Sequence, residues 1–483
     1  MGLEWYQRTG LGCKMNMMDW AFHMNNNKDM FTTDALKRNH TQRHLIKFLC
    51  EPLCLCVFAV KSTTFILPKI LLPSSKRGVV MLSLFLLLLT TFTRAQEIDL
   101  LLKNGLVIDP ANNVNARLDV AIADGKIVKV APGIATDKAK KVMDVTGLYI
   151  CPGLIDIHTH VFVGSKPDTF ADGILSLSPD DFTFRSGVTT VVDAGTSGWR
   201  NFPVFKDQVI DRSKTRILAF LNIAGAGMSG KQTQEDIDDM DPTKAVAAIQ
   251  KYPDIIVGIK IGHYEGTEWT PFENALAAAN ESNVPLLVEC HLPQYTLEDQ
   301  LNRMRAGDII THSFEKVSER MSVIDEQGNV RPFVRDAQKK GILFDVGHGG
   351  AGFWFSEAIP ALQQGLAPNS FGTDLHRFSM NAGMKDMLNM MSKYLSMGMT
   401  KEDIIVRATW APAKAIKRTD LGQLSEGAVA DVAVLSLRNG NFGFVDAGGN
   451  KIEGKQKFEA ELTIRAGKIV WDLNGLSAVK FTK

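Results

Sequence analysis

Two histidines that could bind a metal ion, His158 and His160, end an apolar run that begins at Leu154. Alternate side chains of a β-strand point to the same face, so both imidazoles would face the same way. Neutral imidazole is the commonest metal-ligating side chain in proteins. The pair therefore predicts one half of a metal site at the carboxyl end of a strand.

Four further residues with side chains that can serve metal ions lie in or directly after later apolar runs. They are Lys260 within IIVGIKI, His291 after LLVEC, His312 after DIIT, and Asp374 after SFGT. Each could be an ordinary core residue when taken alone. Together with the histidine pair they predict a site for two divalent ions, for which zinc is expected while manganese, iron and cobalt stay open.

Lys260 is the unusual member of this set. A buried ammonium beside metal ions is poorly solvated and repelled by them. Reaction of the amine with CO₂ gives a carbamate, an oxygen-donor anion that can bridge two cations. We therefore expect Lys260 to be carboxylated and to bridge the ions; an ion-paired lysine, or one that extends to solvent, is the alternative.

This donor set predicts hydrolysis. A hydroxide held between two metal ions is a nucleophile at neutral pH, because a metal ion lowers the pKa of bound water to about 7. We expect Asp374 to be the catalytic residue that takes the proton and passes it to the leaving group. A thiol nucleophile at Cys290 is a weaker alternative, because the strand neighbour of His291 points to the opposite face.

The elements that would position these residues are eight strand-like apolar runs with helix-competent sequence between them. Their ranges are 154–160, 188–193, 217–223, 255–261, 284–289, 309–312, 342–345 and 370–374. Eight regularly spaced β-α units predict an α/β fold, a (β/α)₈ TIM barrel over residues 151–415, whose active site lies at the carboxyl ends of the strands.

Residues that alternate between apolar and polar character occur at both ends of the chain beyond residue 95. They cover 99–107, 119–130, 431–435 and 462–470, with turn signals at Asp124-Gly125 and Ala466-Gly467. We expect residues 96–150 and 416–483 to combine into a small β-sandwich domain built from both chain ends.

The first 95 residues differ from the rest. Residues 1–80 hold four of the six cysteines and no sustained helix or strand period, and we expect them to be a spurious or disordered extension. Residues 81–95 read as a secretory signal peptide, preceded by basic residues and ending in Thr93-x-Ala95. Its apolar stretch is shorter than the about 20 residues that cross a bilayer. We therefore expect an exported protein, periplasmic or secreted, without a stable membrane span after cleavage; a genuine extension with a buried apolar helix is the alternative.

Composition excludes several classes of protein. With 54 basic and 53 acidic residues, the chain has no basic excess for binding nucleic acid. A hydrophobic share of 45% is enough for a large core, which argues against a long disordered chain. Six cysteines in 483 residues are too few for a disulfide framework.

From Gln96 to its end the sequence resembles the amidohydrolase superfamily. The matching segments are CPGLIDIHTH, VGIKI, FGTDLH and TWAPAKAI with LGQLSEGAVADVAVL, and VVDAGTSG and FDVGHGGAGFWF are similar to its amidohydrolase/deacetylase branch, which is often labelled dihydroorotase. The resemblance implies that His158, His160 and Asp374 bind one ion, that His291 and His312 bind the second, and that carboxylated Lys260 bridges them. It also implies a barrel with a terminal β-sandwich.

The expected substrate is a small acylated compound, and the expected reaction is hydrolysis of its amide or ester bond, with removal of an acetyl group from an N- or O-acetylated acid preferred. A cyclic amidase of dihydroorotase or hydantoinase type is the alternative, weakened because Phe162 stands where such enzymes carry an arginine. A non-catalytic scaffold is disfavoured because all six ligand positions are filled, and a homo-oligomer stays open.

The candidate substrate-binding residues are His348, Gly349, Gly350 and Trp354. For His348 a purely loop-stabilising role stays open, and His263 and Arg377 are further pocket candidates.

Overall fold

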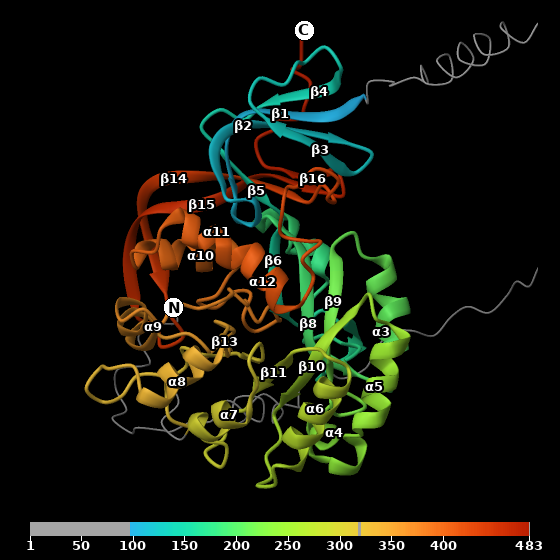
Figure 1. Ribbon diagram of the computed structural model, residues 1–483, viewed down its shortest axis with the longest axis vertical. Coiled ribbons are helices and arrows are strands. Elements are labelled where there is room, and N and C mark those ends of the chain that lie inside the picture. The colour runs from blue at the N-terminus through green and yellow to red at the C-terminus, as the bar shows by residue number, and fades with distance from the viewer. Residues whose placement is uncertain (1–96, 317–319, 483) are drawn as a thin grey trace, which may run out of the picture. The chain divides into compact units, whose positions relative to one another are not determined.

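The computed structural model describes residues 97–316 and 320–482 (Figure 1). The predicted extension over residues 1–80 and the predicted signal peptide over 81–95 lie outside the described residues, so both stay predictions. Within the described ranges, none of the helices combines the length and the apolar character that crossing a bilayer requires.

A curled sheet of seven parallel strands holds the middle of the chain, in the order β13-β12-β11-β10-β9-β8-β6. Its strands are β6 (Leu154–Thr159), β8 (Val188–Gly198), β9 (Arg216–Asn222), β10 (Ile256–Gly262), β11 (Leu286–Glu289), β12 (Ile309–Ile310) and β13 (Leu343–Phe344). Nearly all their residues are buried, as expected for parallel strands covered on both faces. The sequence predicted a strand at each of these seven places.

The eighth predicted strand, 370–374, is not a regular strand. Its segment joins both edges of the curled sheet only by single bridges, from Ser370 to Asp345 and from Leu375 to Thr159. Backbone hydrogen bonds still join it to both edges, for example from the Val346 N–H to Ser370 O at 3.2 Å and from the Asp374 N–H to His158 O at 2.7 Å. Two carboxylates add to these bonds: Asp345 Oδ1 accepts from the Gly372 N–H at 2.8 Å, and Asp156 Oδ1 accepts from the Thr373 N–H at 3.0 Å. The segment thus closes the ring through backbone and side-chain hydrogen bonds together.

Helices alternate with the strands and cover the sheet from outside (Figure 1). They are α3 (Phe202–Gln208), α4 (Lys231–Glu235), α5 (Pro242–Lys251), α6 (Thr270–Glu281), α7 (Leu297–Arg303), α8 (Pro332–Lys340), α9 (Phe355–Gln363), α10 (Met387–Ser396), α11 (Lys401–Ala408) and α12 (Trp410–Ala415). In α5 the Asp241 carboxylate caps the Thr243 and Lys244 N–H groups, and Val246 and Ile249 lie on its buried face.

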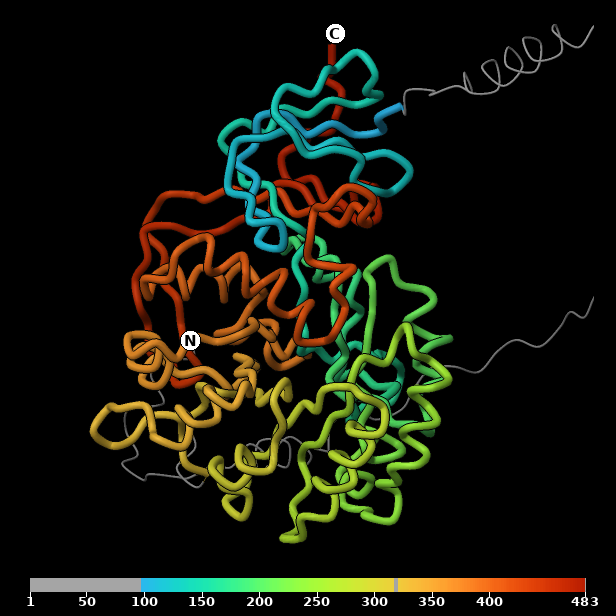
Figure 2. Tube along the Cα trace, in the orientation of Figure 1, coloured from blue at the N-terminus to red at the C-terminus, as the bar shows by residue number. Residues whose placement is uncertain are grey.

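Strands from both ends of the described chain form a second sheet, with the path β16-β15-β14-β5-β1-β2-β3 and β4 beside β1. They are β1 (Ile98–Asp109), β2 (Val114–Ala123), β3 (Lys126–Ala131), β4 (Ala139–Asp144), β5 (Tyr149–Pro152), β14 (Val432–Val445), β15 (Lys451–Arg465) and β16 (Lys468–Asp472). The two chain ends meet where β5 pairs antiparallel with β14, and the trace in Figure 2 shows the N-terminal and C-terminal segments together. Hydrogen bonds link these strands into one sheet, so the predicted packing of two sheets as a sandwich stays a prediction, as do the predicted domain boundaries.

Both predicted turns are present in this second sheet. Asp124 and Gly125, with φ of 51° and 72°, join β2 to β3, and Ala466 and Gly467, with φ of 48° and 76°, join β15 to β16. Positive φ at both central residues is the turn geometry that matches strand twist, and it explains a glycine at the second position of each turn.

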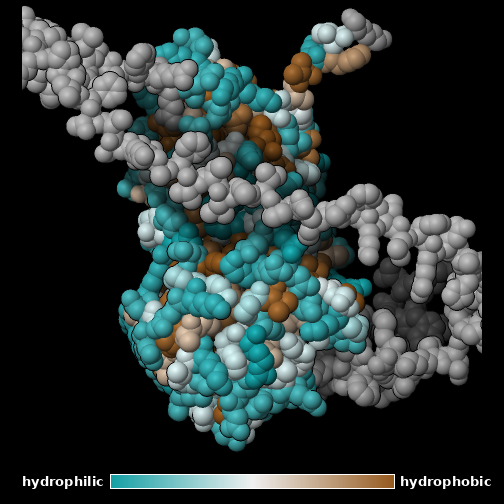
Figure 3. Space-filling model, turned by 90° about the vertical axis from the view of Figure 1, so that its right-hand side faces the viewer, coloured by the Kyte–Doolittle hydropathy of each residue, from teal (hydrophilic) through white to brown (hydrophobic). Residues whose placement is uncertain are grey.

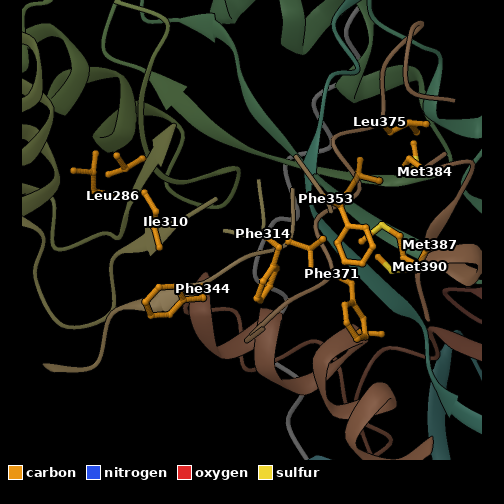
Figure 4. Close-up of a cluster of buried hydrophobic side chains, with 14 of the residues drawn as sticks. Leu286, Ile310, Phe314, Phe344, Phe353, Phe371, Leu375, Met384, Met387 and Met390 are labelled. Atoms are coloured by element: carbon orange, nitrogen blue, oxygen red, sulfur yellow. The ribbon is translucent and has the colours of Figure 1, made fainter. Parts of the chain in front are cut away.

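Apolar side chains fill the space between the curled sheet and its helices. Figure 4 shows part of this core, in which Leu286 and Ile310 from the sheet lie near Phe344 and Phe314, and Met387 and Met390 of α10 contribute further along. On the face shown in Figure 3, the described residues are mostly hydrophilic with scattered hydrophobic groups. The buried polar residues at the carboxyl ends of the strands are therefore an exception that needs a function.

Candidate metal centre

The six predicted ligands lie together at the carboxyl ends of the curled sheet. His158 is the penultimate residue of β6, and Lys260 lies near the end of β10. The other four residues follow β6, β11, β12 and the segment that begins at Ser370; they are His160, His291, His312 and Asp374. His158, His160, Lys260, His312 and Asp374 are buried, and His291 is partly exposed.

One group of ligand atoms centres on Asp374. Its Oδ1 lies 3.1 Å from His160 Nε2 and 3.6 Å from His158 Nε2. Two ligands at zinc–ligand distances of about 2.1 Å in tetrahedral geometry are separated by about 3.4 Å. The three side chains therefore have the spacing of ligands to a single ion, as predicted for the first metal.

A second group centres on Glu289, which the sequence analysis missed. Its Oε1 lies 3.0 Å from His263 Nε2, 3.2 Å from His312 Nε2 and 3.3 Å from His291 Nε2. Its Oε2 contacts Lys260 Nζ and lies 3.8 Å from His158 Nε2. Glu289 thus lies between the first group and the remaining histidines.

The five imidazoles of these groups share one arrangement: each Nδ1 has a hydrogen-bonding partner, while each Nε2 faces a carboxylate of the centre. The Nδ1 partners are Thr311 for His158 (2.8 Å), Thr196 for His160 (3.0 Å), Gln234 for His263 (3.2 Å), Glu315 for His291 (2.8 Å) and Gly347 O for His312 (2.6 Å). Metal-ligating histidines are held in this way, because the outer partner fixes both the tautomer and the direction of the ring.

Two buried nitrogens at the centre, His158 Nε2 and His312 Nε2, lack a hydrogen-bond partner within the described part of the chain. Such atoms are rare, because a buried polar group without a partner costs free energy. Both belong with Glu289 to one group of possible ligands, and Glu289 also forms a buried ion pair with Lys260. This donor set, imidazole nitrogen and carboxylate oxygen, fits two divalent ions.

Burial and neighbouring charges set the protonation states. Burial lowers the pKa of His160 to about 3, so its imidazole is neutral, as a ligand must be. Burial opposes charge on Asp374, but His376 and His158 beside it hold the pKa of its carboxyl well below its usual range. Burial would also lower the pKa of His291, but Glu315 and Glu289 raise that pKa to about 9.

Backbone strain also occurs at this centre. His263, His312 and Asp374 have φ of 64°, 51° and 52°, in the left-handed region that few residues other than glycine adopt. Residues held in such conformations cost about 1–3 kcal/mol each and cluster at functional sites.

The predicted substrate-binding residues are only partly at the centre. A Cβ on Gly349 would lie 2.1 Å from Asp374 Oδ2, so the loop backbone packs against this carboxylate, whereas Gly350 is exposed. His348 is buried, with its Nε2 2.6 Å from Lys393 Nζ. Trp354 packs against Gly448 between β14 and β15, and its indole N–H donates to Ala351 O at 2.9 Å.

Supporting residues of the centre were also missed from the sequence. Thr311 Oγ1 donates to Asp345 Oδ2 at 2.8 Å while it contacts the ring of His158. The buried Arg320 donates to the backbone carbonyls of Cys290 and His312, at 3.1 and 3.3 Å, and so ties two strand ends together. Glu289 could have been found by strand alternation, since it stands two residues before His291.

The chain is similar to several known enzymes, whose names give different activities. The profile of the amidohydrolase family matches residues 356–470. A deacetylase of Brucella anthropi is 32% identical over 358 residues, which are 72% of this chain and 87% of that protein. Solved structures of an adenine deaminase and a dihydroorotase are 30% and 29% identical, cover 78% and 77% of this chain and 100% and 99% of their own, and have TM-scores of 0.71 and 0.68.

Proposed function

Because this chain belongs to the amidohydrolase family, we propose that it is a metal-dependent hydrolase that removes an acetyl group from a small N- or O-acetylated acid. The observation that carries the proposal is the set of five imidazoles and two carboxylates that form three overlapping groups of possible metal ligands. The deacetylase name of the Brucella anthropi relative supports the choice of acyl group.

We assign one ion to His158, His160 and Asp374 and a second ion to His291 and His312. Two divalent ions bound there, which we take to be zinc, would activate water at neutral pH and withdraw charge from the substrate carbonyl. Imidazole and carboxylate donors are those that zinc prefers.

Asp374 moves the proton in this proposal. Its Oδ1 faces the histidines of the first group, and its Oδ2 lies 3.6 Å from His376 Nε2. Because its pKa is held well below the usual range, the carboxylate is charged at neutral pH and is free to accept a proton from water. The same group then donates that proton to the leaving nitrogen or oxygen.

The position between the ions is where sequence and structure point to different residues. The sequence predicts a carbamate on Lys260 there, whereas Glu289 contacts the Lys260 amine in the structure. Either group would supply one negative charge between the ions.

The surroundings of the centre favour a small acyl group. The ring of Phe170 lies 4.9 Å from that of His160 and 5.6 Å from that of His376, measured between centroids, and offers an apolar wall. Phe162, at the position where cyclic amidases carry an arginine, is fully buried against Phe205, so no cation reaches the substrate from this position.

The test is an assay of the protein starting at Gln96 with N-acetyl and O-acetyl acids, dihydroorotate, hydantoins and adenine. Acetate release that depends on bound metal supports the proposal. Turnover of only the cyclic compounds would favour the cyclic amidase, an alternative that the similarity to a dihydroorotase supports. Ammonia release from adenine would favour a deaminase.

We also propose that the mature protein begins near Gln96 and is exported. The supporting observation is the signal-like sequence over residues 81–95. Mass spectrometry of the N-terminal peptide from the native host would identify the first residue, and a start within residues 1–80 would contradict the proposal.

A further inference from the structure

We propose that Glu289 is itself a ligand of the second metal ion, in the place that the sequence assigns to a carbamate on Lys260, and that His263 completes the ligand set. This inference rests on the proposed metal-dependent function and specifies how its second ion is held.

Glu289 Oε1 lies close to three imidazoles; Glu289 forms one group of possible ligands with His263 and His291 and another with His158 and His312. Three Nε2 atoms, those of His263, His291 and His312, lie 3.0–3.3 Å from this one oxygen. These separations approach the about 3.4 Å expected between ligands that share one tetrahedral zinc ion. His158 Nε2 belongs to the first ion, because it also lies 3.6 Å from Asp374 Oδ1 and one nitrogen lone pair serves a single metal.

His263 is oriented like the other histidines of the centre. Gln234 Oε1 lies 3.2 Å from its Nδ1, which leaves Nε2 for the centre. Its φ of 64° turns the chain just after β10 and directs the ring toward Glu289. A surface histidine would need neither a partner on its far nitrogen nor a strained backbone.

Lys260 faces the Glu289 carboxylate. Nζ contacts Glu289 Oε2, and both side chains are buried. The stem packs closely against the neighbouring strands, because a Cβ on Gly195 would lie 2.6 Å from Lys260 Cδ and one on Gly262 would lie 3.2 Å from its Cε.

The negative charge that two divalent ions require between them also favours Glu289 as a ligand. A bridging carbamate was expected because two divalent ions need an anion between them, and the Glu289 carboxylate already lies there. Lys260 then acts as the partner of Glu289 Oε2 and fixes the direction of this carboxylate, which makes Lys260 a positioning residue.

The experiment compares four full-length proteins, the wild type, Glu289→Gln, Lys260→Met and His263→Asn, with Glu357→Gln as a control. Glu357 is also a buried glutamate, but it lies on α9 outside the centre. Each protein is loaded with Zn²⁺ or Co²⁺ and its metal content is measured, together with the absorption spectrum of the Co²⁺ form. The wild type is also equilibrated with ¹³C-bicarbonate, and a carbamate carbon is sought by ¹³C NMR.

We expect two ions per chain and no carbamate signal in the wild type, two ions in Lys260→Met and Glu357→Gln, and one ion in Glu289→Gln. In His263→Asn we expect the second ion to bind at least about tenfold more weakly. A carbamate signal together with loss of an ion only in Lys260→Met would overturn the inference but leave the proposed hydrolase intact. A wild type that binds no metal would instead overturn the proposed function.

Circular dichroism and thermal unfolding establish whether each variant is folded. If Glu289→Gln does not fold, Glu289→Asp keeps the charge but shortens the side chain, and its affinity for the second ion should still fall. The carbamate measurement needs no variant, so a signal in the wild type contradicts the inference in every case.

Discussion

Thr311 Oγ1 lies 2.8 Å from His158 Nδ1 and 2.8 Å from Asp345 Oδ2, so one hydroxyl connects a metal-facing imidazole to a fully buried carboxylate. Since the hydroxyl donates to Asp345, its lone pair accepts from the Nδ1–H, which leaves Nε2 of His158 free for a metal ion.

Replacement of this hydroxyl should weaken metal binding without removing a ligand. We expect Thr311→Val to lower the affinity for the first ion roughly 10- to 100-fold, the usual effect of losing an outer partner of a ligand. Competition with a chromophoric chelator measures it. The control is Thr189→Val, whose hydroxyl has no partner among the described residues; equal losses in both variants would contradict the role of Thr311.

Removal of the metal should abolish activity and also lower stability. The unpartnered His158 Nε2 and His312 Nε2 stay buried in the apoprotein, whereas bound ions stabilise only the folded state. At a free metal concentration 100-fold above the Kd the stabilisation is about 2.7 kcal/mol per site. Thermal unfolding with chelator and after re-addition of Zn²⁺ measures the shift, and unchanged unfolding temperatures would argue against a metal centre.

Asp374→Asn should lower kcat by about 10²- to 10⁴-fold, because an amide cannot take up the proton in the transition state. Part of the loss comes from weaker binding of the first ion, so metal content is measured beside kcat. Asp336→Asn, at an exposed position of α8, serves as the control. Activity near the wild-type level in metal-loaded Asp374→Asn would remove Asp374 from the mechanism.

Cys290→Ala should keep kcat/KM within about tenfold of the wild type. Burial raises the pKa of the Cys290 thiol to about 12, so almost no thiolate exists at neutral pH. Steady-state kinetics on both proteins provide the check. A loss as large as that of Asp374→Asn would bring back the thiol nucleophile.

Lys393 should make the stability of the protein depend on pH. Burial lowers the pKa of Lys393 to about 7 in the folded protein, against 10.5 in an unfolded chain. Between these values the unfolded chain binds more protons, so the free energy of unfolding rises with pH, by up to about 1.4 kcal/mol per pH unit. Below pH 7 both states are protonated and this contribution stays constant.

Lys393→Met should remove this rise, while Lys339→Met, at an exposed position, should leave it in place. Urea unfolding of the three proteins at pH 7 and pH 9.5 measures the slope. Parallel behaviour of the wild type and Lys393→Met would show that Lys393 does not titrate in this range.

The sequence predicted much of the fold because strands buried on both faces leave long apolar runs, as around Lys260 and Val191. His158 and His160 lie at the end of β6, as the sequence predicted, whereas Asp374 follows a segment that is not a regular strand. The irregular course of 370–374 could not be predicted from local patterns, because Asp156 and Asp345, distant in sequence, supply part of its hydrogen bonds.

Glu289 was missed for a different reason. A glutamate at the end of a strand occurs in many proteins without a metal ion, whereas a histidine there is a stronger signal for a metal ligand, so the sequence favours His291. Only the positions of His263 and His312 around the same carboxylate oxygen distinguish Glu289 from an ordinary solvent-exposed glutamate. Strand alternation gives a local hint from the spacing of Glu289 and His291, but the approach of His263 and His312 to this carboxylate comes from residues distant in sequence.

The pairing of β5 with β14 has a consequence for how the chain acquires its structure. Cys151 Sγ contacts Ala433 O across 282 positions of sequence, and β1 reaches β14 only through β5. A ribosome must therefore have synthesised nearly the whole polypeptide before β5 acquires β14 as its second neighbour, although β1 and β5 can already pair with each other. Contacts of such long range slow folding, and they leave the edge of β5 unprotected until the last 50 or so residues arrive.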